Sequence, residues 1–302
     1  MPSPRPLRSP AELLRLSPAE ADSLLDHLER TVPVRPSLVQ LPRDTAEEAV
    51  LFGDSHGDWR STEEVVARYR AAPRLLIGLG DYVDRPPEDC GQGSVANGLY
   101  LLGLAAEAPD RVFLIQGNHE VVRRIAALPH HLPDELDELW GPDSTRYDRL
   151  LGLFERGPLA VTTSNGAYLA HAGFPRGKLP DPWTQAFVEP DDERLAEITW
   201  AECEASRVRR GAALPWGLRE FEAFLHATGL RLMVRGHDPD LTGRPIYGGR
   251  CLTLHTSRIY EQYGGVLVAR MPLRSPLRTV ADLSVEHLPT EGQWYPPPAD
   301  GR

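Results

Sequence analysis

Five apolar segments of the chain end in polar side chains that could bind a metal ion. In chain order they end in GDSHGD, GDYVDR, GNHE, HAG and RGHD. Carboxylates and imidazoles gathered in one place would repel one another or lie desolvated unless a cation bound them. Carboxylate and amide oxygens mixed with imidazole nitrogens suit divalent ions of intermediate hardness, such as manganese, iron or zinc. The five clusters therefore predict a metal site rather than a set of unrelated turns.

The segments that carry these clusters alternate with helical patterns, which predicts an α/β fold with a largely parallel sheet. Ligands bind at the carboxyl ends of the strands in such a sheet, so the clusters should meet at one edge. Ser61 or Thr62 is expected to cap one helix, and Gly229 to end another. Strands are predicted at 48–54, 74–81, 111–118, 167–173, 230–237, 251–255 and 264–271, and helices at 17–31, 61–71, 94–108, 218–229 and within 121–160.

Composition divides the 302 residues into three parts. A Pro-rich start and a helix that begins at Ser17 and Pro18 predict an N-terminal helical arm over residues 1–45, packed on the outside of the domain. Residues 46–287 contain all five clusters and are predicted to form one catalytic domain. The last residues, GQWYPPPADGR, predict a flexible tail over 288–302.

Charge and cysteine content narrow the class of protein. The net charge of −10 disfavours binding to nucleic acid or to anionic membranes, although Arg207, Arg209 and Arg210 could form a local basic patch. No apolar run is long enough to span a membrane, and no secretory signal follows the basic N-terminus. The three cysteines have no framework spacing and are expected to be free thiols. We therefore expect a cytoplasmic protein.

The motifs GDSHG, GDYVDR, GNHE, HAG and RGH, in this order, resemble those of the phosphoprotein phosphatases. This family of calcineurin-like metallophosphoesterases includes the eukaryotic serine/threonine phosphatases and their bacterial and phage relatives. The resemblance runs from about Ala49 to about Tyr260, and GNHE with GDxxDR upstream is a highly specific combination. It implies a sandwich of two mixed sheets flanked by helices, with the site at the carboxyl ends of the strands. It also suggests the bacterial branch of the family.

The resemblance implies a site for two divalent ions, with manganese expected and iron or zinc as alternatives. Two such ions would activate a hydroxide that attacks phosphorus in line. Six residues are implied as ligands: Asp54 and His56 for the first ion, Asp81 as the bridge, and Asn118, His171 and His237 for the second.

The resemblance also assigns catalytic and substrate-binding roles. His119 would protonate the leaving group, and Asp84 would hold His119 in place. Arg85, Arg210 and Tyr260 would lie at the phosphate. Planar guanidinium groups suit the phosphoryl oxygens, which carry charge in the transition state.

Three departures from the family pattern lie around the predicted cleft. Pro86 and Pro87 follow Arg85 where the family usually has Gly, and Gln116 replaces a common Arg. The segment HTSRIY stands where eukaryotic members have SAPNY, so His255 is not expected to bind metal. These changes alter the rim of the cleft, which leaves the substrate preference open.

The leading interpretation is an enzyme that hydrolyses phosphoserine and phosphothreonine in proteins, with phosphotyrosine as a further substrate. The alternative is an Ap4A-type dinucleoside polyphosphate hydrolase or another small phosphoester hydrolase. Symmetric Ap4A hydrolases usually carry Asp where this chain has Glu120, which favours the phosphatase, and Glu120 itself is expected to support the ligands. A non-catalytic metal-binding scaffold is disfavoured by the complete set of ligands and acid. An RNA phosphodiesterase is disfavoured by the net charge.

Overall fold

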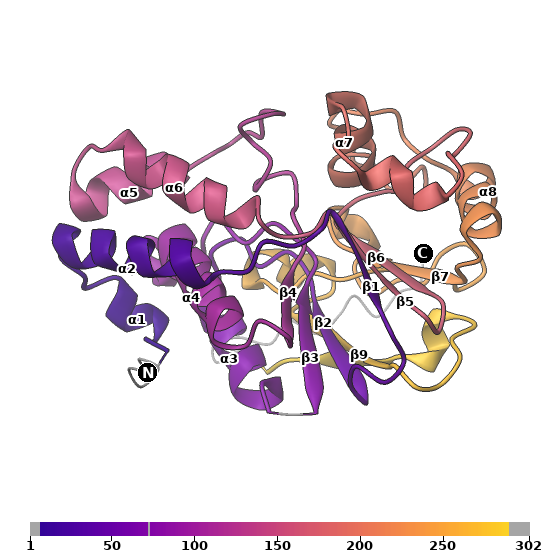
Figure 1. Ribbon diagram of the computed structural model, residues 1–302, viewed down its shortest axis with the longest axis horizontal. Coiled ribbons are helices and arrows are strands. Elements are labelled where there is room, and N and C mark those ends of the chain that lie inside the picture. The colour runs from indigo at the N-terminus through magenta and orange to yellow at the C-terminus, as the bar shows by residue number, and fades with distance from the viewer. Residues whose placement is uncertain (1–6, 72, 290–302) are drawn as a thin grey trace.

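Two five-stranded sheets form the centre of the molecule (Figure 1). The computed structural model describes residues 7–71 and 73–289. The first sheet comprises, in spatial order, β10 (Ser284–His287), β9 (Leu267–Pro272), β2 (Glu48–Phe52), β3 (Arg74–Gly78) and β4 (Val112–Leu114). The second comprises β1 (Leu38–Leu41), β5 (Ala160–Thr163), β6 (Ala167–Ala170), β7 (Leu232–Arg235) and β8 (Cys251–Thr253).

Both sheets contain parallel and antiparallel pairs. In the first sheet β2, β3 and β4 are parallel, and β9 runs antiparallel to both β2 and β10. In the second sheet only the pair β5 and β6 is antiparallel. The predicted sandwich of two mixed sheets is confirmed.

Side chains alternate along the strands between two apolar cores. Ala49 and Leu51 of β2 belong to the core between the sheets, together with Leu169 of β6. Val50 and Phe52, the residues between and after them, belong to the core beneath the helices. This period of two is what a strand buried on both faces requires.

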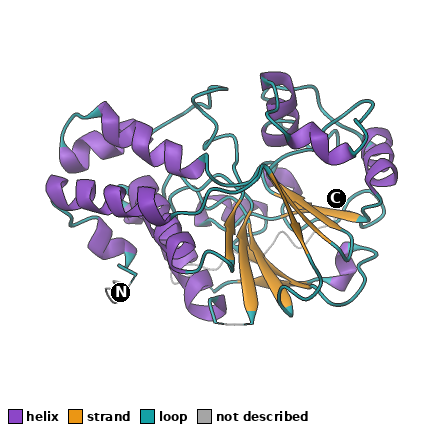
Figure 2. Ribbon diagram, viewed as in Figure 1, coloured by secondary structure: helices purple, strands orange, loops and turns teal. Residues whose placement is uncertain are grey.

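Helices lie on both sides of the strands, as Figure 2 shows. The helix after β2, α3 (Trp59–Tyr69), packs against α4 (Gly93–Glu107). On the other side are α7 (Asp192–Thr199) and α8 (Leu218–Thr228), at the right of Figure 1. A larger group lies at the left and comprises α1 (Pro10–Leu13), α2 (Pro18–Thr31), α4 (Gly93–Glu107), α5 (Leu132–Trp140) and α6 (Ser144–Phe154).

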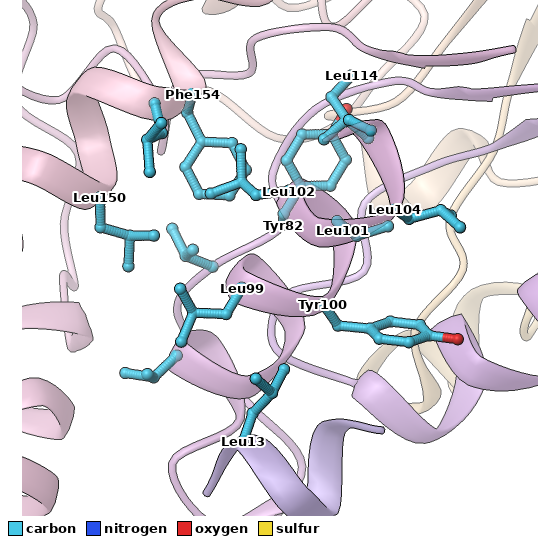
Figure 3. Close-up of a cluster of buried hydrophobic side chains, with 14 of the residues drawn as sticks. Leu13, Tyr82, Leu99, Tyr100, Leu101, Leu102, Leu104, Leu114, Leu150 and Phe154 are labelled. Atoms are coloured by element: carbon cyan, nitrogen blue, oxygen red, sulfur yellow. The ribbon is translucent and has the colours of Figure 1, made fainter. Parts of the chain in front are cut away.

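The core of the larger helix group joins the N-terminal segment to the rest of the protein. Figure 3 shows Leu13 of α1 beside Leu99 of α4. The ring of Phe154 stacks on Tyr82, with ring centroids 5.6 Å apart. Because Tyr82 follows Asp81 directly, this core also supports a loop that carries predicted site residues.

The N-terminal segment forms the predicted helix α2 and also a strand. Ser17 caps α2 by accepting a hydrogen bond from the backbone N–H of Glu20, and Leu25 and Leu28 are buried. Strand β1 lies inside the segment predicted as an arm and pairs in parallel with β5. The segment from α1 to β1 thus contributes to both a helix layer and a sheet.

Several elements differ from the predictions. The caps predicted at Ser61 or Thr62 are wrong, because Asp58 accepts from the backbone N–H of Ser61 and starts α3 one turn earlier. The αL residue Gly229 ends α8 as predicted. The short elements β1, β5, β10 and α7 were not predicted. Most of the predicted tail, residues 290–302, lies outside the described residues, and within the described ranges the helices lack the length and apolar character needed to span a membrane.

Candidate dinuclear metal site

The six predicted metal ligands meet at one edge of the two sheets and are all buried. Asp81 lies between the others, with its Oδ2 3.5 Å from Nε2 of His56 and 3.4 Å from Nε2 of His171. Asn118 Oδ1 lies 2.9 Å from His171 Nε2 and 3.0 Å from His237 Nδ1. The ligands follow five strands: Asp54 and His56 follow β2, Asp81 follows β3, Asn118 follows β4, His171 follows β6 and His237 follows β7.

Potential ligand atoms form two groups that share Asp81. One group contains His56, Asp81 and His119, and the other contains Asp81, His171 and His237, with the atoms of each group within 4.8 Å of one another. Asp54 lies beside the first group, with Oδ2 3.9 Å from His56 Nε2. A carboxylate shared by two groups is the arrangement that a pair of neighbouring metal ions requires.

Each predicted histidine ligand has one ring nitrogen held by a backbone carbonyl. His56 Nδ1 lies 2.9 Å from Val83 O, and His171 Nδ1 lies 2.9 Å from Leu79 O. His237 Nε2 lies 3.1 Å from Trp200 O. Because a carbonyl only accepts, Nδ1 of neutral His56 and of neutral His171 carries the proton, and Nε2 keeps its lone pair for a metal. His56 Nε2 is buried with no hydrogen-bond partner, as expected for a ligand atom, so the donor set fits two divalent ions.

The turns that present these residues use an uncommon backbone conformation. His56, Asp81, Asp84, Arg85 and His237 have φ between 41° and 73°. They are five of the seven non-glycine residues with positive φ in the described part of the chain. Positive φ is unfavourable for residues with a side chain and persists where the surrounding structure imposes it. Strain is therefore concentrated at the predicted site.

Charges at the site favour a cation near Asp81. Burial acts to lower the pKa of His171, but the charges of Asp81 and Asp54 outweigh it and raise the pKa to about 9. Burial and the charge of Arg85 lower the pKa of His56 to about 3. Burial and the charge of Arg210 lower the pKa of His237 well below its usual value. Neutral imidazole is the form that binds metal, so His56 and His237 are ready as ligands.

His119 lies at the rim of the first ligand group and is fully buried. Its Nδ1 lies 2.5 Å from Asp84 Oδ2, and its Nε2 lies 2.8 Å from a guanidinium nitrogen of Arg85. Burial would raise the pKa of Asp84, but hydrogen bonds from His119 and His130 lower it instead. A carboxylate on Nδ1 fixes the imidazole and leaves Nε2 directed toward the site, 4.0 Å from Asp81 Oδ2.

The three predicted phosphate-binding residues lie on two sides of the ligands. Arg85 donates to the Tyr260 hydroxyl at 3.4 Å, and the Tyr260 ring lies 5.7 Å from that of His56. Arg210 comes from the loop between α7 and α8, and its guanidinium lies 3.0 Å from His237 Nε2 and 3.1 Å from His237 O. Tyr260 and Arg85 thus border the first metal group and Arg210 borders the second.

Glu120 ties two strand ends together. Its carboxylate accepts hydrogen bonds from the backbone N–H groups of Asp81, Tyr82 and Gly117, each at 2.8 Å. Burial and the charge of Asp81 raise the pKa of Glu120 to about 8, against the effect of these three donors. The side chain therefore joins the turn after β3 to the turn after β4.

Several residues at the site were not predicted from the sequence. His255 is buried, and its Nε2 lies 3.2 Å from Asp54 Oδ2. Glu202 is buried and accepts from the backbone N–H of Arg210 at 2.7 Å. His130 reaches Asp84 Oδ2 at 2.8 Å. By contrast, Arg235 of the RGHD motif pairs with buried Asp238. His255 lies two residues after β8, as His237 lies two residues after β7, so the same strand-end signal could have identified it.

A family model and several curated proteins are similar to this chain. Residues 49–241 match the family model described as calcineurin-like phosphoesterase. The chain is 28% identical to a PP2A-like serine/threonine-protein phosphatase of Candida albicans, over 82% of this chain and 59% of that protein. It is 26% identical to the serine/threonine-protein phosphatase 4 catalytic subunit of Kluyveromyces lactis, over 70% of this chain and 69% of that protein.

A solved structure shares the fold. A serine/threonine phosphatase of Saccharomyces cerevisiae, described as similar to human phosphatase PP5, superposes with a TM-score of 0.73 at 20% identity and covers 92% of each chain. The present chain spans only 48% to 59% of the length of three of its curated relatives.

Proposed function

Because this chain belongs to the calcineurin-like phosphoesterase family, we propose that it hydrolyses phosphoserine and phosphothreonine monoesters in proteins, with phosphotyrosine as a further substrate. The main support is the position of Asp81 between two ligand groups, with a carboxylate-bound histidine beside them. Relatives whose names describe them as serine/threonine-protein phosphatases support the substrate class.

The proposed metals are two divalent ions, with manganese as the expected pair. When bound, such ions lower the pKa of water and neutralise charge on the phosphoryl oxygens. Six residues would hold them: Asp54, His56 and Asp81 for one ion, and Asp81, Asn118, His171 and His237 for the other. The choice of manganese over calcium follows from the three imidazoles in this set, because calcium prefers oxygen ligands.

The remaining site residues would bind the phosphate and move a proton. Arg85 lies at the first ligand group and Arg210 at the second, so their guanidinium groups could each bind a phosphoryl oxygen. Tyr260 holds Arg85 through its hydroxyl. Protonated on both nitrogens, His119 would deliver the Nε2 proton to the departing oxygen, while Nδ1 stays on Asp84 and Arg85 turns from Nε2 to the phosphate.

We also place the protein in the cytoplasm, because its three cysteines are free and buried. Its proposed partners are phosphorylated proteins or small phosphoesters rather than nucleic acids or membranes.

Substrate turnover tests this function most directly. We expect manganese-loaded protein to release phosphate from a phosphoserine peptide and, more slowly, from a phosphotyrosine peptide. Ap4A and a cyclic nucleotide should be poorer substrates. Preferential cleavage of Ap4A would replace the proposal with the dinucleoside polyphosphate hydrolase, and no turnover of any of the four would overturn both.

A further inference from the structure

Asp84 binds a second histidine besides the proposed acid. Its Oδ2 lies 2.5 Å from Nδ1 of His119 and 2.8 Å from Nδ1 of His130. His130 comes from the loop before α5, and its side chain is 11% exposed. No part of the proposed mechanism uses this histidine.

The contacts identify a hydrogen-bonded cluster rather than a third metal site. Asp84, His119 and His130 could form a ligand group by proximity alone. However, two imidazole nitrogens at 2.5 and 2.8 Å from one oxygen are at hydrogen-bonding distance. The other oxygen, Oδ1, accepts from the backbone N–H groups of His131 and Leu132 at 2.6 and 3.0 Å. With four donors the carboxylate of Asp84 is fully used.

The far side of His130 is also held. Its Nε2 lies 2.9 Å from the hydroxyl of Tyr147 on α6, and the two rings meet edge to face with centroids 5.5 Å apart. Because Nδ1 donates to Asp84, a neutral His130 has only a lone pair on Nε2, which accepts from the Tyr147 hydroxyl. The result is a chain of hydrogen bonds from Tyr147 through His130 and Asp84 to His119.

The remaining support of Asp84 comes from its backbone. The Asp84 N–H donates to Ser94 Oγ at 2.9 Å, and Ser94 Oγ in turn donates to Glu135 of α5 at 2.5 Å. Asp84 itself has a φ of 67°, so its conformation needs such external support. Two side chains contact the Asp84 carboxylate: the proposed acid, His119, and His130.

We propose that His130, backed by Tyr147, is a positioning residue that holds Asp84 in the place where it orients the acid His119. This inference rests on the proposed function. It does not require His130 to touch substrate or to change its charge. The proposed role connects His119 to helices α5 and α6, which contribute none of the proposed metal ligands.

The role predicts a dependence on the leaving group. An alkyl oxygen, as in phosphoserine, is a poor leaving group and needs the proton from a well-oriented His119. An activated aryl phosphate such as 4-nitrophenyl phosphate needs it much less. Loss of His130 should therefore lower the kcat for alkyl substrates selectively and leave KM and the metal ions unchanged.

The test compares four variants on both substrates with two manganese ions confirmed by elemental analysis. His130→Leu should lower kcat for a phosphoserine peptide about 10- to 100-fold, the effect typical of residues that orient a catalytic group. It should change turnover of 4-nitrophenyl phosphate less than about threefold. His130→Asn retains a donor near the position of Nδ1 and should restore most of the loss. Tyr147→Phe should cost about two- to fivefold, equivalent to one hydrogen bond.

The control and the opposing outcomes separate this inference from the proposed function. His226→Leu, on the exposed face of α8, should behave as the parent protein. Equal losses on both substrates, or no loss in His130→Leu and Tyr147→Phe, would overturn the role of His130 while leaving the phosphatase in place. If His130→Leu melts early, Tyr147→Phe decides the matter by the same leaving-group comparison. Absence of turnover by the parent protein would instead refute the proposed function.

Discussion

The two sheets bring different chemistry to the same edge. The turns of the first sheet carry the carboxylates of Asp54, Asp81 and Asp84, together with the amide of Asn118, the imidazole of His56 and the proposed acid. The strand ends of the second sheet carry imidazoles, His171 and His237. The first sheet also holds four of the five site residues with positive φ, and the second sheet holds only His237.

Both sheets supply metal ligands, but only the first supplies carboxylates and the proposed acid. The first sheet concentrates negative charge on strained turns, which a cation must balance. The second sheet adds two nitrogen ligands, and of their turns only the one at His237 has positive φ. We therefore expect changes to the second-sheet ligands His171 and His237 to weaken metal binding. Changes in the first sheet can affect the chemistry while the metal stays bound.

Removal of the metal should have the largest effect on turnover, because both sheets supply its proposed ligands. Exhaustive chelation should lower phosphate release by about 10³-fold or more, since no side chain replaces a metal-activated water. Manganese should restore turnover better than calcium, which prefers an all-oxygen shell. The measurement is phosphate release paired with elemental analysis. Full turnover by protein shown to be free of metal would contradict the dinuclear site.

The same substitution in each sheet sharpens the comparison. His119→Asn, in the first sheet, should reduce turnover of phosphoserine by about 10²–10⁴-fold and reduce that of an activated aryl phosphate less. It should leave two ions bound. His171→Asn, in the second sheet, should instead weaken metal binding, measured by calorimetry. Loss of metal in His119→Asn would show that this residue is a ligand and would remove the distinction between the sheets.

Arg210 tests whether the side of the second sheet also contributes to binding of the phosphate. Arg210→Lys should cost about 2–4 kcal/mol of transition-state stabilisation, because an ammonium group cannot bind two oxygens in the way a guanidinium does. Arg85→Lys should cost a similar amount. The matched control is Arg207→Lys, whose exposed side chain lies three residues away. Equal and mild effects of Arg210→Lys and Arg207→Lys on turnover of a small substrate would show that Arg210 does not bind the phosphate. Only residues of the first sheet would then bind it.

The smallest effect on turnover should come from the helix layer beyond both sheets. Leu28 of α2 is 1% exposed within the apolar core of the larger helix group. Leu28→Ala should lower the free energy of unfolding by about 2–5 kcal/mol and leave kcat/KM unchanged. Chemical denaturation and steady-state kinetics measure the two quantities. A large fall in kcat/KM without loss of stability would mean that the helix layer shapes the site.

Much of the site could be predicted because its signals are local. A buried apolar run followed by Gly-Asp or Gly-Asn shows where a strand ends and which side chains it presents. This is why Asp54, Asp81 and Asn118 could be identified from the sequence. Strand β1 could not be identified in this way, because only one of its four residues is buried and its partner β5 is far along the chain.

Other residues depend on contacts that no local pattern encodes. His130 meets Asp84 across 46 residues, and nothing in the segment around His130 indicates this partner. His255 is a different case, because it lies two residues after β8 just as His237 lies two residues after β7. The strand-end pattern predicts His255 beside Asp54, whereas the comparison with the family motif SAPNY predicts that His255 does not bind metal.

The pairing of β2 with β9 has a consequence for how the site comes into being. Strand β2 pairs with β9 across more than 200 residues, and just after β2 the N–H of Gly53 donates to the Thr256 hydroxyl, 203 residues further along the chain. Closing such a long loop is slow, and proteins rich in distant contacts fold slowly. As the chain leaves the ribosome, Asp54 and Asp81 therefore emerge long before His237 and the strand that pairs with β2. A growing chain should acquire its metal only late in synthesis, and until then its acidic turns stay exposed to whatever cations the cell supplies.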